Sequence, residues 1–180
     1  TTGADNTSIG SRALENNTTA SNNTAVGRYA LYANTTGAGN TAIGYQALKT
    51  NTTGGGNTIV GRMAGFSNTT ASNNTAFGQA ALYFNTTGTQ NVAVGNNALF
   101  WNSTANYNTA LGNTALQANT TGASNTAVGS DSLKANTTAS NNTATDTLTN
   151  VAGCDSIVTL DLTINYSSDS IITVTACDSF

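Results

Sequence analysis

A repeat of 17 residues runs through most of this chain and constrains its fold more than any other feature. Glycines that close an Asn-Thr-Ala-apolar-Gly run recur at a constant interval, and so do the asparagines that open it. These glycines are Gly10, Gly27, Gly44, Gly61, Gly78, Gly95, Gly112 and Gly129. Eight units follow one another without insertion or deletion, and a ninth starts at Asn142 but lacks the apolar residue and the glycine. A period kept this strictly indicates structural units stacked in register.

The length of the period selects the architecture. Repeats built from helix pairs need more than about 30 residues, so a unit of 17 residues cannot hold one. The unit suits one coil of an all-β solenoid, or β-roll, with two short strands and two turns. We therefore predict a β-solenoid of eight to nine coils over residues 1–143, and a rod roughly 40 Å long because coils lie ~4.8 Å apart.

Each position of the repeat becomes a column along such a rod, and two apolar columns are predicted to fill its interior. They are Ile9, Val26, Ile43, Val60, Phe77, Val94, Leu111 and Val128, and then Leu14, Leu31, Leu48, Gly65, Leu82, Leu99, Leu116 and Leu133. Adjacent residues of a strand point to opposite faces, so the neighbouring alanines, such as Ala25 and Ala30, are predicted to point outward. Two small apolar columns on the surface favour close packing against another rod, and hence a homo-oligomer.

A second asparagine column opens the Asn-Thr-Thr or Asn-Ser-Thr runs. Its members are Asn17, Asn34, Asn51, Asn68, Asn85, Asn102, Asn119 and Asn136. Each fits the acceptor pattern for N-glycosylation. Amides stacked in register also form hydrogen-bonded ladders that satisfy turn backbone. We favour the ladder, because the same residue recurs in every coil whatever its exposure.

The variable positions of the repeat hold most of its aromatic residues and all of its charges except Asp5. Several of the aromatic residues fall in one column or beside it on consecutive coils, which predicts a contact face for a glycan or a protein. The residues of this face are Tyr32, Phe66, Tyr83, Phe84, Phe100 and Trp101. The alternative is a stack of rings that only stabilises the solenoid, or that forms part of a subunit interface.

Residues 144–180 differ in composition, with five aspartates and no Lys or Arg. Residues 156–165 alternate as a strand does, and residues 170–176 follow as a second strand. A lone β-hairpin is too small to fold alone, so we expect a cap or part of a β-sandwich that belongs to a neighbouring module. Cys154 and Cys177 each lie in a Cys-Asp-Ser triplet, and a disulfide is the default for an extracellular chain. Whether they pair with each other or with other cysteines stays open.

Composition excludes several classes of function. The chain has no His and only two Cys, so catalytic triads, structural zinc sites and iron–sulfur clusters are not expected. Five Lys and Arg and a net charge of −3 argue against nucleic acid. No apolar run approaches the ~18 residues of a membrane span. We predict no enzyme, catalytic residue, metal or cofactor.

Because the given sequence begins at Thr1, we expect it to be a piece of a longer protein.

The repeat core, seen in Ala25-Val26-Gly27 and Ala42-Ile43-Gly44, resembles the head repeats of YadA-type trimeric autotransporter adhesins and similar repeats of phage tail fibres. Those adhesin heads are left-handed β-rolls that form trimers and bind host or matrix surfaces, which implies a homo-oligomer, trimer or higher. The Cys-Asp-Ser triplets of residues 145–180 resemble repeats of giant cell-surface adhesins of Bacteroidota, typically exported by type IX secretion. This second resemblance implies an extracellular, cell-surface location.

Three functional hypotheses follow. The first is a structural or adhesive segment of a long extracellular surface fibre, whose partners are further copies of itself and a glycan or other cell-surface ligand. The second is the shaft of a phage or virion tail fibre. The third is a surface that binds ice or another crystal, because Thr24, Thr41, Thr58 and Thr75 recur at coil spacing.

Overall fold

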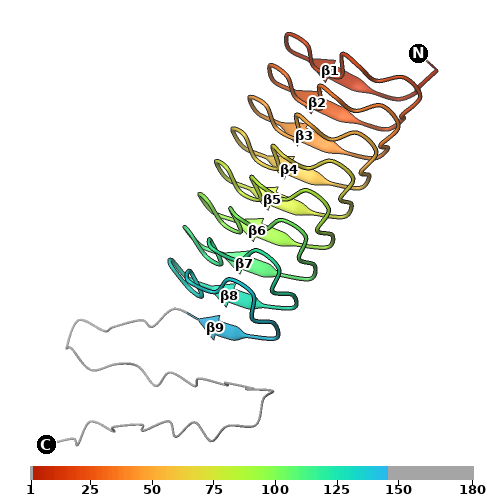
Figure 1. Cartoon of the computed structure of the whole chain (residues 1–180). Helices are drawn as coiled ribbons and strands as arrows, with labels where there is room; N and C mark the ends of the chain where they lie inside the picture. Colours follow the sequence, from red (N-terminus) through yellow and green to blue (C-terminus); the bar gives the residue numbers. More distant parts are fainter. Residues whose placement is uncertain (1, 146–180) are drawn as a thin grey trace, which may run out of the picture.

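The computed structural model describes residues 2–145, and over this range the chain is a stack of coils with one β-strand in each (Figure 1). The strands are β1 (Thr7–Ile9), β2 (Thr24–Val26), β3 (Thr41–Ile43), β4 (Thr58–Val60), β5 (Thr75–Phe77), β6 (Val92–Val94), β7 (Thr109–Leu111), β8 (Thr126–Val128) and β9 (Thr143–Thr145). They form a single sheet in chain order, and every pair is parallel. Within the described range there is no helix. The all-β solenoid predicted from the repeat is confirmed.

Successive strands pair with an offset of one repeat. Thr24 lies opposite Thr41 and Ala25 lies opposite Ala42, and the same register continues to β9. Each sequence column is therefore a column in space. The ninth strand forms even though the unit that begins at Asn142 lacks the apolar residue and the glycine of the others.

Each coil contains one strand, so the prediction of two strands per coil is wrong. Two consecutive β-turns follow the glycine instead. The Gly27 carbonyl accepts a hydrogen bond from the Ala30 amide at 3.2 Å, and the Leu31 carbonyl accepts one from the Asn34 amide at 3.2 Å. Tyr29 and Leu31 have left-handed backbone, with φ of 62° and 49°. Such a conformation cannot continue a strand.

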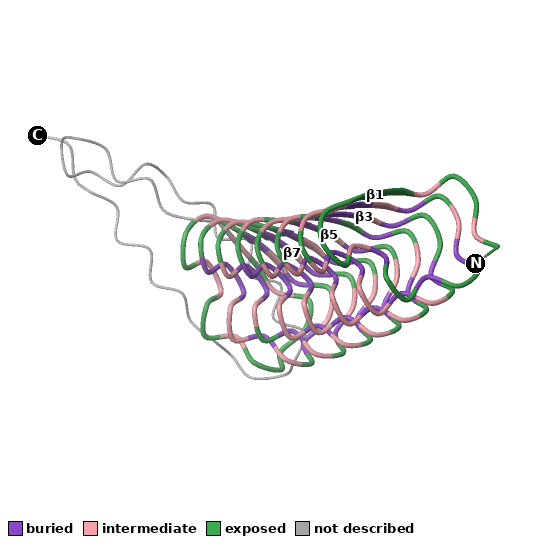
Figure 2. Cartoon of the chain, turned by 90° about the horizontal axis from the view of Figure 1, so that it is seen from above, coloured by how far each residue is buried: buried purple, intermediate pink, exposed green. Residues whose placement is uncertain are grey.

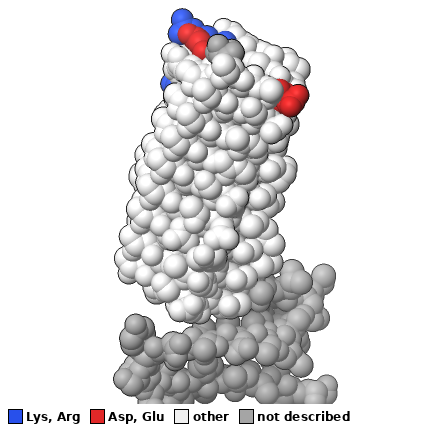
Figure 3. Space-filling view, turned by 90° about the vertical axis from the view of Figure 1, so that its right-hand side faces the viewer, with Lys and Arg blue, Asp and Glu red and all other residues white. Residues whose placement is uncertain are grey.

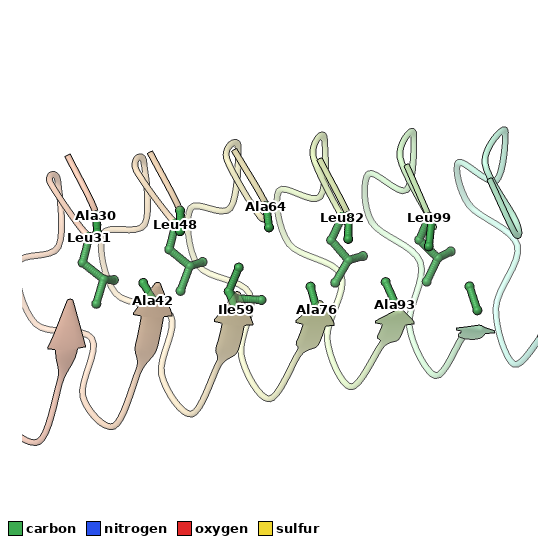
Figure 4. Packing of buried hydrophobic residues seen from close by; sticks show 14 of the residues in the cluster. Ala30, Leu31, Ala42, Leu48, Ile59, Ala64, Ala76, Leu82, Ala93 and Leu99 are labelled. Carbon is green, nitrogen blue, oxygen red and sulfur yellow. The ribbon is translucent and has the colours of Figure 1, made fainter. Parts of the chain in front are cut away.

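The core is a narrow space between the sheet and these turns. Leu31, Leu48, Leu82, Leu99 and Leu116 are fully buried in it, as predicted for their column. Small strand residues such as Ala42 and Ala76 point from the sheet toward those leucines (Figure 4). In Figure 2 the buried positions recur at the same place in successive coils, so the core runs along the whole rod.

The column from Ile9 to Val128 lies outside, so the prediction that it fills the interior is wrong. Ile9 is 60% exposed and Phe77 is 42% exposed. Only the middle residue of each three-residue strand points inward, because side chains alternate along a strand. That middle residue is Ala in most coils, and the two residues that flank it face solvent.

The alanines are buried, so the prediction of an outward alanine surface is also wrong. Ala25 has no exposed surface because it is the middle strand residue, and neither Ala30 nor Leu31 has any. Ala30 and Leu31 are adjacent and both face the core, because the left-handed backbone at Leu31 breaks the alternation. The alanine columns therefore give no basis for packing between rods.

Two ladders of asparagine amides connect the coils. In the turn ladder, Asn51 Nδ2 donates to Asn34 Oδ1 and to the Gly54 carbonyl, both at 2.9 Å. In the strand ladder, Asn40 Oδ1 accepts from the Asn57 amide at 3.0 Å and from Asn57 Nδ2 at 2.9 Å. Among the described residues, no buried side-chain nitrogen or oxygen lacks a partner. The ladder interpretation is confirmed for the Asn34 column, and the amides from Asn17 to Asn119 are buried and so not accessible as glycosylation acceptors in the folded coil.

Only glycine fits directly after strands β1 to β7. Gly27 has a φ of 129°, and a Cβ added there would lie 2.5 Å from the Gly44 carbonyl oxygen of the next coil. The coils approach each other through bare backbone at this column, which explains why the glycine recurs without exception in eight units.

The predicted hairpin and both cysteines, Cys154 and Cys177, lie outside the described residues. Of the segment 144–180, only Ala144 and Thr145 are described, and both belong to β9.

Candidate functional site

The outer side of the sheet, which we call the strand face, presents two columns of side chains. One is the column from Ile9 to Val128, and the other is formed by the first residue of each strand, a threonine in every coil except at Val92. Every member of both columns from β1 to β8 is half-buried or exposed. No charged residue occurs in either column. The strand face is therefore a continuous, uncharged surface along the rod, with an apolar column beside a column of threonines.

An aromatic ladder lies on the turns that follow the glycines. Phe66 and Tyr83 stack with ring centroids 5.1 Å apart, and Tyr83 and Phe100 stack at 5.2 Å. A second stack beside them joins Phe84 and Trp101 at 4.3 Å, with the planes 3° apart. Edge contacts connect the two stacks. Because repeat positions lie in register, one aromatic residue per coil is enough to build each stack.

The structure brings together five of the six aromatic residues predicted to form a contact face. Tyr32 is the exception, because its ring packs edge-on against Tyr29 at 5.4 Å. Tyr83 has rings on both of its faces, so a sugar ring cannot stack on it. Ring edges and the half-exposed Trp101 (49% exposed) remain open to a partner. The ladder thus stabilises the coils and also offers a limited apolar surface.

Three cations surround one ring at the N-terminal end of the ladder; we call Arg12, Arg28 and Lys49 the basic cluster. The Arg28 guanidinium lies 4.8 Å from the centroid of the Tyr29 ring. Arg12 and Lys49 lie 5.6 Å and 5.4 Å from the same centroid. The Lys49 ammonium also lies 5.3 Å from the centroid of the Phe66 ring, so the basic cluster and the aromatic ladder form one continuous strip.

Arg62 extends this positive charge by one coil. Its guanidinium lies 6.0 Å from the centroid of the Tyr45 ring, and Tyr45 follows Arg28 in the same column. The one ion pair among these residues joins Arg12 to Glu15 at 3.6 Å. Cation–π contacts, and not carboxylates, hold most of these cations, so the strip keeps a net positive charge.

The rest of the solenoid is almost uncharged. No charged residue occurs between Arg62 and Asp131, and Figure 3 shows the charged atoms, blue together with some red, gathered at the N-terminal end above a broad white surface. Asp131 accepts hydrogen bonds from Lys134 and from the Thr114 hydroxyl, which lower the pKa of its carboxyl group. Lys134 lies 2.7 Å from Asp131, so this basic residue is neutralised locally.

The side chains of residues 2–145 form no candidate metal site. The structure has no group of three or more His, Cys, Asp or Glu residues placed to hold a metal ion in this range. Neither does it contain, over the same residues, a helix long and apolar enough to cross a membrane.

Comparisons with known proteins return no match: no protein-family model, curated protein or solved structure is significantly similar to this chain. The strand face, the aromatic ladder and the basic cluster are the features of this chain that bear on its function.

Sequence reasoning missed the basic cluster. Arg12, Arg28 and Lys49 occupy three different positions of the repeat, and only the turns bring these positions around Tyr29. A signal did exist, because four of the five basic residues fall in the first four coils.

Proposed function

We propose that this chain is a structural and adhesive segment of a long extracellular surface fibre, in which solenoid rods associate side by side through the strand face. The observation that carries the proposal is the exposed apolar column on the sheet, with Ile43, Phe77, Val94, Leu111 and Val128 all more than a third exposed. Contiguous apolar surface of this kind marks an interaction site when it exceeds a few hundred Å².

A second copy of the rod is the partner that fits this face best. Both columns are uncharged, so two identical faces meet without charge repulsion. A second rod also has the same spacing of ~4.8 Å between strands, so side chains can interdigitate along the whole length. Closed rotational symmetry is the usual way in which identical surfaces combine, so we propose a closed homo-oligomer of rods; the number of rods, expected from the sequence to be three or more, is what sedimentation measures.

The adhesive part of the proposal is supported by the aromatic residues Tyr32, Phe66, Tyr83, Phe84, Phe100 and Trp101. They lie on the turns and not on the sheet, so rods joined through their strand faces leave the ring edges and the half-exposed Trp101 free to contact a glycan or another cell-surface ligand.

Sedimentation velocity of the full chain tests the association. We expect the wild type to sediment as an oligomer at micromolar concentration, and a Val94→Ser/Leu111→Ser variant to dissociate while it keeps its circular dichroism spectrum. The matched control is Thr87→Ala/Thr104→Ala, which alters exposed residues outside the strand face. A wild type that stays monomeric at high micromolar concentration would exclude lateral association.

Immunogold labelling tests the location. Antibodies against the solenoid should label fibres on the outside of intact producing cells. Labelling of virions would instead support the alternative of a phage or virion tail-fibre shaft, and labelling confined to the cell interior would contradict both.

A binding surface for ice or another crystal is a second candidate, favoured by the placement of the threonines. Thr24, Thr41, Thr58 and Thr75 lie in register on the strand face, and not in the Asn-Thr-Thr turns. Val92 interrupts the column, and the adjacent apolar side chains differ in size. Measurable thermal hysteresis would support this candidate, and its absence would remove it.

A further inference from the structure

We propose that the basic cluster, Arg62 and the adjoining aromatic ladder bind an acidic polysaccharide, a linear chain of sugars with carboxylate or sulfate groups, laid along the rod. This inference rests on the proposed adhesive function and names the class of its ligand. It depends on residues outside the strand face, so the two can be tested separately.

Charge segregation is the first argument. Arg12, Arg28, Lys49 and Arg62 lie in the first four coils, and Glu15 is the one carboxylate within ion-pair distance of any of them in the described range. Aromatic rings hold these cations in place without neutralising them. An anionic partner therefore meets a positive charge that is already positioned, on an otherwise almost neutral rod.

The spacing of the cations is the second argument. Arg28 and Arg62 occupy the same column two coils apart, which places their backbones roughly 10 Å from each other along the rod. This distance is comparable with the length of a disaccharide unit. Lys49 lies in the coil between them, with its ammonium close to the Tyr29 and Phe66 rings. The row of cations thus follows the rod axis, as a linear polyanion would.

The aromatic rings favour a polysaccharide over a nucleic acid. Single-stranded nucleic acid binds through bases stacked on open aromatic faces. In the ladder, Tyr83 has both faces covered by Phe66 and Phe100, and the Lys49 ammonium lies over the Phe66 ring. Binding to duplex DNA depends mainly on phosphates neutralised by Lys and Arg, and the strip has four such cations. A polysaccharide needs few open rings, because its acidic groups pair with the cations and its C–H groups can pack on the exposed side of Trp101.

The test is a binding titration of the full chain against polygalacturonate and dextran sulfate, with neutral dextran and a single-stranded oligonucleotide for comparison. The decisive variant is Arg28→Gln/Lys49→Gln/Arg62→Gln. Its matched control is Lys134→Gln, a basic residue on the same solenoid that is paired with Asp131. We expect the triple variant to bind both acidic polymers about tenfold more weakly or worse, and the control to bind like the wild type. Binding should also weaken with added salt.

Three results would overturn the inference: equal binding by the triple variant and the wild type, an equal loss in Lys134→Gln, or tighter binding of the oligonucleotide than of polygalacturonate. If circular dichroism shows that the triple variant is misfolded, the binding titration is repeated with Arg28→Gln alone, which should keep the fold because that side chain is exposed. Weaker binding of the acidic polymers by this variant is then the expected result, and binding equal to the wild type overturns the inference. Sedimentation of the same samples separates the two proposals. If the chain forms oligomers that bind neither acidic polymer, the polysaccharide inference is refuted and lateral association stands. If it stays monomeric and binds the acidic polymers, lateral association is refuted and the polysaccharide inference stands.

Discussion

Inside the fourth coil, the large side chain of Ile59 compensates for the missing side chain of Gly65. Ile59 occupies a column in which most coils have Ala, and Gly65 occupies the column in which the other coils have Leu. A Cβ added at Gly65 would lie 3.5 Å from Ile59 Cγ2 and 3.3 Å from Leu48 Cδ2. The Ile59 side chain thus fills, from the strand, the space that a leucine fills from the turn elsewhere (Figure 4).

This compensation predicts strong coupling between the two positions. Ile59→Ala alone should destabilise the solenoid by about 3 kcal/mol, because it leaves a cavity next to a glycine. Gly65→Leu alone should cost about 2 kcal/mol through overpacking. The double variant restores the Ala–Leu pair of the neighbouring coils and should unfold near the wild-type denaturant midpoint. Additive losses in the double variant would show that the two positions do not share a space.

The turn ladder predicts a penalty for removing a single amide. Asn68 Nδ2 donates to Asn51 Oδ1 at 2.7 Å, and Asn68 Oδ1 accepts from Asn85 Nδ2 at 3.2 Å. Asn68→Ala leaves both neighbours with a buried polar group that has lost a partner, so we expect a loss of about 2 kcal/mol or more in the free energy of unfolding. Asn96→Ala, at an exposed position, is the control and should change it by less than about 0.5 kcal/mol.

Glycines at two columns should respond differently to substitution. Gly78→Ala places a Cβ 2.4 Å from the Gly95 carbonyl oxygen at a φ of 137°, so we expect a loss of about 3 kcal/mol or failure to fold. Gly39→Asn should be tolerated, because Asn22 and Asn73 already occupy the same column with left-handed backbone. Melting temperatures of the two variants provide the measurement, and a stable Gly78→Ala protein would contradict the close backbone approach.

Acid should affect the solenoid only weakly. The pKa of Asp131 lies below its ordinary value because Lys134 and Thr114 donate hydrogen bonds to the ionised carboxyl group. The unfolded chain therefore binds this proton more readily, so the stabilisation is present above about pH 4 and is lost as the pH falls through the folded pKa. We expect an acid-induced fall in melting temperature that becomes smaller in Asp131→Asn. An equal fall in that variant would assign the acid sensitivity to other groups.

Much of the fold follows from residues alone. The glycines from Gly10 to Gly129 recur every 17 residues without interruption, which requires similar coils stacked in register. The recurring Asn34 column predicts side-chain amides that form hydrogen bonds from coil to coil. The same register explains why Asn and Thr are so abundant. Thr52 Oγ1, for example, donates to the Thr69 carbonyl of the next coil at 3.0 Å, so each copy of a polar residue repeats one intercoil bond.

The aromatic stack was predictable for a similar reason, since Phe66, Tyr83 and Phe100 share a column on consecutive coils. The basic residues that adjoin this stack could not be predicted in the same way. Arg12, Arg28 and Lys49 come from different positions of the repeat, and only the path of the two turns brings them to the Tyr29 ring.

Which columns face inward was decided by tertiary structure. Apolar character alone places Val26 inside and Ala25 outside, whereas the folded coil does the reverse. A strand of three residues offers one inward position, and the space opposite the buried Leu31 accommodates an alanine there. Periodicity establishes that columns exist, but their direction depends on backbone conformation in the turns, where left-handed residues such as Leu31 break the alternation on which a sequence-based assignment relies.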